Sequence, residues 1–145
     1  NSVSAYNFIR LGTMLNNQKY KNIGFDTINA FSSHINRSGR GYTMMLQAVD
    51  YIFSSSYEVL IVGKNEDLKT KEMLQAVYQS KNLNKVIVLL DPNKKEELIQ
   101  LMPFAEFYFS GNSDIPMAYI CKNYTCDLPT NNLSEMIGKL EVRFD

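Results

Sequence analysis

Cys121 and Cys126 are the only cysteines of this 145-residue chain, and they lie close together in the stretch AYICKNYTCDLP. Such a pair could form a disulfide, exchange electrons with another thiol, bind a metal or pack in a core. In a single extended strand the five steps between them, at roughly 3.3 Å each, would separate their α-carbons by about 16 Å. A turn in the four intervening residues, which include the turn-former Asn123, would bring the cysteines within bonding distance.

The spacing of the pair favours some of these roles over others. A thioredoxin-type dithiol has two intervening residues and its first cysteine at a helix N-terminus, whereas here four residues intervene and Cys121 ends a predicted strand. A zinc site takes four ligands, and the only histidine, His34, is distant in sequence. Buried, unreactive cysteines are the leading interpretation, a structural or reversible disulfide is the second, and a metal site is the third. We predict no metal and no cofactor.

Two other groups of residues resemble parts of binding sites. Gly63 follows a predicted strand and precedes a predicted helix, where open α/β sheets bind ligands, but one glycine matches neither the dinucleotide nor the Walker pattern. A plain strand-to-helix turn is the favoured interpretation. His34, Arg37 and Arg40 could bind an anion, although basic residues at a helix end more often complement the helix dipole. No catalytic residues are predicted.

The composition argues against several classes of partner. Fifteen basic residues balance fifteen acidic ones, so the formal net charge is zero and no basic surface for nucleic acid or anionic lipid is expected. The longest apolar runs, VLIVG and VIVLL, are far shorter than the roughly 20 residues that cross a bilayer. Because the chain starts at Asn1, already within a predicted helix, and carries no signal segment, we expect a piece cut from a longer protein. The location that we expect is the cytoplasm, although the missing signal segment says little about where the parent protein resides.

The elements that must position these residues fall into two parts. From Val3 to Phe53 apolar residues recur every three or four positions, which predicts amphipathic helices separated at NNQKY and NRSGRGY. From Tyr57 the pattern changes to EVLIVG and KVIVLL, continuous apolar runs that are typical of parallel strands covered on both faces. The segment between these runs has Met73 and Val77 one helical turn apart, so a right-handed strand–helix–strand unit is predicted.

Further elements are predicted toward the C-terminus. DPNKKEELIQLMP is a predicted helix that Asp91 caps, and AEFYFSG and MAYICKN are predicted strands separated by the turn-rich GNSDIP. TNNLSEMIGKLEVRF is a predicted helix in which Asn132 and Glu135 form a capping box. The sequence thus predicts an α/β protein, with an N-terminal helical hairpin in residues 1–55 and a small mixed sheet with flanking helices in residues 56–145.

Three stretches carry a family resemblance: NSVSAYNFIRLGTML, GYTMMLQAVDYIFSSSYEVLIVG and AYICKNYTCDLPTNNLSEMIGKL. They resemble the C-terminal end of the YyaL-type, or spermatogenesis-associated protein 20, family of thioredoxin-domain-containing proteins. In that family a thioredoxin-like domain precedes a toroid of paired helices similar to six-hairpin glycosidases. The resemblance implies that residues 1–55 are similar to the last toroid helices and residues 56–145 to a terminal appendage. Cys121 and Cys126 match the two cysteines of the family's terminal block.

The resemblance implies a non-catalytic structural or interaction region of a larger protein. Its partner would be the remainder of the parent chain, and a second copy of the chain is a further candidate through the helical segment, because the apolar face of that hairpin needs a cover. Two alternatives stay open. The chain could be a redox auxiliary that uses Cys121 and Cys126, or it could be part of a sugar-processing parent of the epimerase or glycosidase type.

Overall fold

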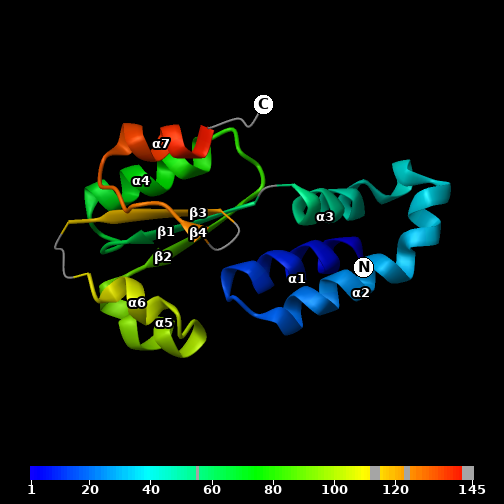
Figure 1. Cartoon of the computed structure of the whole chain (residues 1–145), viewed down its shortest axis with the longest axis horizontal. Coiled ribbons are helices and arrows are strands. Elements are labelled where there is room, and N and C mark those ends of the chain that lie inside the picture. Colours follow the sequence, from blue (N-terminus) through cyan, green and yellow to red (C-terminus); the bar gives the residue numbers. More distant parts are fainter. Residues whose placement is uncertain (55, 112–114, 123–124, 142–145) are drawn as a thin grey trace. The chain divides into compact units, whose positions relative to one another are not determined.

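The computed structural model describes residues 1–54, 56–111, 115–122 and 125–141. The chain divides into two compact units, Asn1–Ser56 and Tyr57–Asp145 (Figure 1). The first unit is helical and the second contains a mixed four-stranded sheet, so the predicted α/β class is confirmed. The predicted turn residue Asn123, the middle of the predicted turn GNSDIP and the end of the last predicted helix lie outside the described residues.

The first unit consists of α1 (Ser2–Met14), α2 (Gln18–Arg37), the short 3₁₀ helix η1 (Gly39–Tyr42) and α3 (Thr43–Phe53). The predicted breaks between these helices are confirmed, because α2 begins at the NNQKY segment and ends just before the glycines of NRSGRGY. The Asn17 side chain accepts hydrogen bonds from the backbone at the start of α2, which satisfies two of the free N–H groups there. Helix α1 packs against both α2 and α3.

The sheet of the second unit has the order β2-β1-β3-β4. Strands β1 (Tyr57–Val62) and β2 (Lys85–Leu90) are parallel and are connected through α4 (Leu68–Gln79), as predicted. Strand β3 (Met117–Lys122) returns antiparallel to the other side of β1, and β4 (Thr125–Cys126) pairs with β3. The antiparallel β3 makes the sheet mixed, and it places the end of β3 beside the start of β1.

Each face of the sheet is covered by a different pair of helices. Helices α4 and α7 (Leu133–Glu141) lie on one face, and α5 (Lys95–Leu101) and α6 (Ala105–Phe109) lie on the other (Figure 1). Side chains of β1, β3, α4 and α7 form the main core of the unit on the first face: Tyr57, Val59, Ile61, Met73, Val77, Ala118, Ile120, Met136 and Leu140. Because side chains alternate along a strand, the intervening residues of β1 and β3 belong to the second face.

One predicted strand is wrong. The segment AEFYFSG forms the helix α6 and does not join the sheet. Its aromatic residues favour a strand by composition. However, Phe104 and Tyr108 are one helical turn apart, and their rings meet edge to face with 6.4 Å between the centroids. The predicted helix DPNKKEELIQLMP forms as a 3₁₀ turn, η2 (Pro92–Lys94), followed by α5, and the Asp91 side chain caps it as predicted.

Half of the predicted capping box at α7 is present. Asn132 Oδ1 accepts a hydrogen bond from the Glu135 backbone N–H at 3.1 Å. The Glu135 carboxylate instead accepts from the Thr130 hydroxyl at 2.6 Å and forms an ion pair with Lys139 at 2.9 Å. Thr130 also forms an isolated bridge to Ala118 in β3, so this arrangement connects the start of α7 to the sheet.

Candidate functional site

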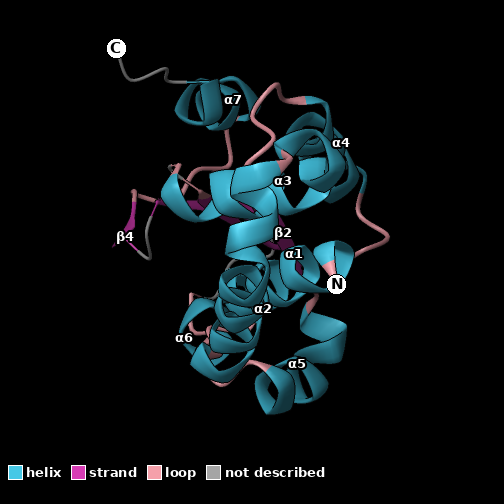
Figure 2. Cartoon of the chain, turned by 90° about the vertical axis from the view of Figure 1, so that its right-hand side faces the viewer, coloured by secondary structure: helices cyan, strands magenta, loops and turns pink. Residues whose placement is uncertain are grey.

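The two cysteines face each other across the β3–β4 hairpin. Cys121 and Cys126 are directly paired in the antiparallel ladder, and a disulfide joins them. Strand β4 lies at the outer margin of the sheet (Figure 2). Cys121 is only 3% exposed, whereas Cys126 is exposed to solvent. The two cysteines therefore differ in their exposure to a molecule that arrives from outside.

A buried acidic residue, Glu58, lies next to this disulfide. It is directly opposite Cys121 in the β1–β3 ladder and is only 6% exposed. Because Tyr57 and Val59 belong to the core under α4 and α7, the Glu58 side chain lies on the other face of the sheet, together with Cys121. The sequence analysis missed Glu58. The sequence signal that could have identified Glu58 is a charged residue at the start of the otherwise apolar run EVLIV.

Two tyrosines complete the group. Tyr108 of α6 donates a hydrogen bond from its hydroxyl to Sγ of Cys126 at 3.4 Å. Its ring packs edge to face on Tyr119 of β3, with 4.9 Å between the ring centroids. Burial raises the pKa of Tyr108 above its usual value, and the neighbouring Tyr119 and Glu58 charges raise it further. The phenol is thus a neutral hydrogen-bond donor at physiological pH, and it lies within the electrostatic field of Glu58.

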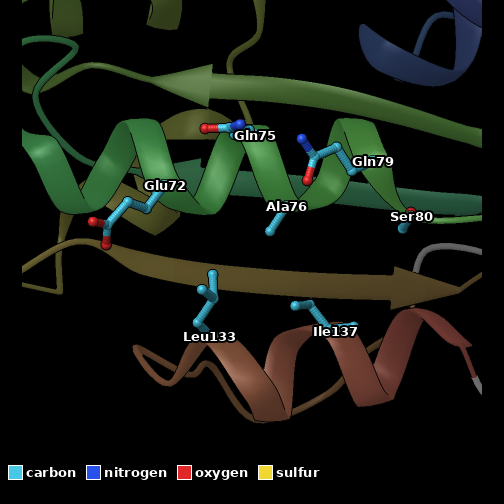
Figure 3. Close-up of a pocket in the computed structure, with 7 residues that line it drawn as sticks. All are labelled: Glu72, Gln75, Ala76, Gln79, Ser80, Leu133 and Ile137. Atoms are coloured by element: carbon cyan, nitrogen blue, oxygen red, sulfur yellow. The ribbon is translucent and has the colours of Figure 1, made fainter.

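A separate shallow groove of about 390 Å³ runs between α4 and α7 (Figure 3). Leu133 and Ile137 line it from α7, and residues of α4 line its other side: Glu72, Gln75, Ala76 and Gln79, with Ser80 at the end of the helix. Glu72 is the one carboxylate among these lining residues. A single acid without a nucleophile or a second acid–base partner does not suggest a reaction, so we centre the candidate site on the disulfide.

The residues around Gly63 form a packed turn. A β-carbon added to Gly63 would overlap Oγ1 of Thr70 and would lie 3.1 Å from Cβ of Pro116. Asp91, at the end of the neighbouring strand, accepts hydrogen bonds from the backbone N–H groups of Asn65 and Asn93. The geometry agrees with the interpretation of Gly63 as a strand-to-helix turn.

The basic residues considered as an anion site lie at the end of α2. His34 and Arg37 are in its last turn and Arg40 is in η1, where positive charge complements the helix dipole. The His34 ring also packs against Phe31 and Tyr42.

Among the residues that the structure describes, no group of three or more His, Cys, Asp or Glu side chains could hold a metal ion. None of the helices that the structure describes is both long and apolar enough to span a membrane.

Comparison with curated proteins finds relatives in three mammals. Over 136 residues the chain is 26% identical to spermatogenesis-associated protein 20 of Homo sapiens, and the same identity and length apply to the proteins of that name from Rattus norvegicus and Mus musculus. Each match covers 94% of this chain and the C-terminal 17% of the relative. The chain is homologous to the C-terminal region of spermatogenesis-associated protein 20.

The homology confirms the resemblance that the sequence carries to this family. The chain spans 17% of the length of these relatives, so it corresponds to one region of a larger protein. No family model matches the chain. No solved structure matches it significantly.

Proposed function

We propose that the chain is a structural and interaction region at the C-terminal end of a larger protein and does not itself catalyse a reaction. The observation that carries this proposal is the match of 94% of the chain to the last 17% of its relatives. The partner that we propose is the remainder of the parent protein, which by family resemblance holds a thioredoxin-like domain and a toroid of paired helices.

Apolar side chains on the helical unit support this proposal. Val3 of α1 is 57% exposed, and Phe53 at the end of α3 is 85% exposed. Covering apolar surface releases roughly 25 cal/mol per Å², so a partner surface over these side chains would be stabilising. We therefore propose the helical unit, α1 to α3, as the part that contacts the parent or, failing that, a second copy of the chain.

Substitutions in the isolated chain and in the full-length parent test this proposal. We expect Val3→Ser and Phe53→Ser to leave the urea midpoint of the isolated chain nearly unchanged, because both side chains already contact water. In the parent the same substitutions should lower the unfolding temperature, because there they would remove buried surface. Leu83→Ser, which changes an 85% exposed leucine of the second unit, is the matched control. Equal effects in the isolated chain and the parent would contradict the proposal.

The disulfide favours a second candidate function, that of a redox auxiliary. In this role Cys121 and Cys126 would exchange electrons with a dithiol elsewhere in the parent protein. Titration of thiols with and without a reductant tests this redox role. We expect no reactive thiol before reduction and two reactive thiols after mild reduction under native conditions. Two unreactive thiols under both conditions would exclude this role.

A further inference from the structure

We propose that the Cys121–Cys126 disulfide is an exchange site with a fixed direction, in which Cys126 carries the mixed disulfide and Glu58 accepts the proton of Cys121. This proposal rests on the second candidate function and adds to it the order of the steps and the residue that moves the proton.

Access to the two sulfurs sets the order. An external thiolate must reach the sulfur it attacks, and Cys126 is exposed whereas Cys121 is 3% exposed. In reduction, the thiolate of an incoming thiol therefore bonds to Cys126, and the Cys121 sulfur leaves with the electron pair of the broken S–S bond. The Tyr108 hydroxyl already donates to the Cys126 sulfur at 3.4 Å, which makes Tyr108 a positioning residue for the attacked atom.

Proton movement at the buried sulfur is assigned to Glu58. In the oxidative direction Cys121 must lose a proton before its thiolate can attack Cys126, and water has little access to a sulfur at this depth. Glu58 is the cross-strand neighbour of Cys121, a position from which side chains interact directly. Glu58 is directly opposite Cys121, and Cys121 is directly opposite Cys126, so the three side chains form one row on the same face of the sheet.

In the closing step Glu58 takes the proton from the Cys121 thiol, and the Cys121 thiolate attacks the Cys126 sulfur of the mixed disulfide. The partner leaves as a thiolate, which accepts a proton from water. One S–S bond breaks and one forms. Among the described residues, the titratable groups near Glu58 on this face include Tyr108 of α6 and Tyr119 and Cys121 of β3.

Glutathione and the whole chain provide the test. The reduced chain is mixed with oxidised glutathione, the reaction is stopped with acid, and mass spectrometry counts the free, mixed-disulfide and closed forms. We expect Cys121→Ser to form the mixed disulfide at Cys126 at least about 100-fold faster than Cys126→Ser forms it at Cys121, because burial restricts attack. Equal rates would overturn the assigned order.

The closing step tests Glu58. In Glu58→Gln we expect closure at pH 7 to slow by at least about tenfold, while the first step, measured in the Cys121→Ser background, stays unchanged. Glu106→Gln, which removes an exposed acid on α6, should behave as wild type. If Glu58→Gln does not fold, the pH dependence of the closure rate of the wild-type chain tests the role of Glu58 instead. A closure rate that rises tenfold per pH unit from about pH 6 to about pH 8 would indicate simple thiol ionisation and would overturn the role of Glu58.

These outcomes separate the two proposals. If the chain closes with glutathione as described but does not exchange with a protein dithiol of the parent, the redox auxiliary function fails and the exchange chemistry stands. If exchange with the parent proceeds but the two cysteines react equally or Glu58→Gln closes normally, this inference fails and the auxiliary function stands.

Discussion

Gly63 shows how the lack of one β-carbon shapes the turn from β1 into α4. Thr70 is fully buried and Pro116 packs on the other side, so an added methyl group has no room. We expect Gly63→Ala to lower the free energy of unfolding by about 1–3 kcal/mol, the usual cost of overpacking.

Gly138→Ala is the matched control, because a β-carbon there meets nothing within 4 Å. It should raise stability by up to about 1 kcal/mol, since alanine is the better helix former. Urea unfolding measures both changes, and a neutral Gly63→Ala would contradict the packing argument.

Tyr108 gives the folded chain a sensitivity to alkaline pH. Burial, Tyr119 and Glu58 raise the pKa of Tyr108 above its usual value of 10.0, so the folded state holds the phenolic proton to higher pH than the unfolded state does. The stabilisation is fully present below about pH 10 and is lost as the pH rises through the folded pKa. We expect the stability of Tyr108→Phe to fall less than that of wild type between about pH 9 and about pH 11. Urea unfolding at several pH values measures this, with Tyr78→Phe, a change at an exposed tyrosine, as the control. Parallel curves for wild type and Tyr108→Phe would contradict the expectation.

At the level of elements, α7 depends on its first turn. The Asn132 side chain accepts the Glu135 backbone N–H, which otherwise has no partner within the helix. We expect Asn132→Ala to lower the free energy of unfolding by about 0.5–2 kcal/mol. Asn131→Ala, at the exposed neighbouring position, should change it much less. Chemical denaturation followed by circular dichroism compares the two variants, and equal losses would show that the cap does not stabilise α7.

The same elements show what the sequence could and could not predict. Continuous apolar runs predicted β1 and β2 correctly, and three- to four-residue spacing predicted α1 to α4. The segment of α6 was missed because five residues with three aromatic side chains suit a strand and a helix equally well by composition, and tertiary contact with Tyr119 accompanies the helical form.

The candidate site was predictable only in part for a similar reason. A turn between the cysteines could be inferred from their spacing. Glu58 and Tyr108 are separated from them by many residues, and they approach the disulfide only through the β1–β3 register and the packing of α6. Periodicity within one segment contains no information on such a register, which is set when the strands pair.

At the level of the whole molecule, the two units should differ in their ability to fold as isolated fragments. The core cluster lies entirely within residues 57–145, and the helical unit is a short segment that carries exposed Val3 and Phe53. We expect a fragment of residues 57–145 to unfold cooperatively in urea, whereas a fragment of residues 1–56 should self-associate or lose helix content. A domain of about 60 residues buries only about 60% of its surface, which leaves it marginally stable alone. Sedimentation and circular dichroism of both fragments measure this. A monomeric, cooperatively folding 1–56 fragment would contradict the expectation.

The central position of β1 has a consequence for the time course of folding. Its parallel partner β2 follows it closely along the chain, whereas its antiparallel partner β3 comes from much later in the sequence. Pairing of distant segments requires closure of a long loop and is generally slower. We therefore expect β1, α4 and β2 to assemble first and the β3–β4 hairpin to join last. Pulse-labelled amide exchange would resolve this order, and under oxidising conditions the appearance of the disulfide would then report that the sheet is complete.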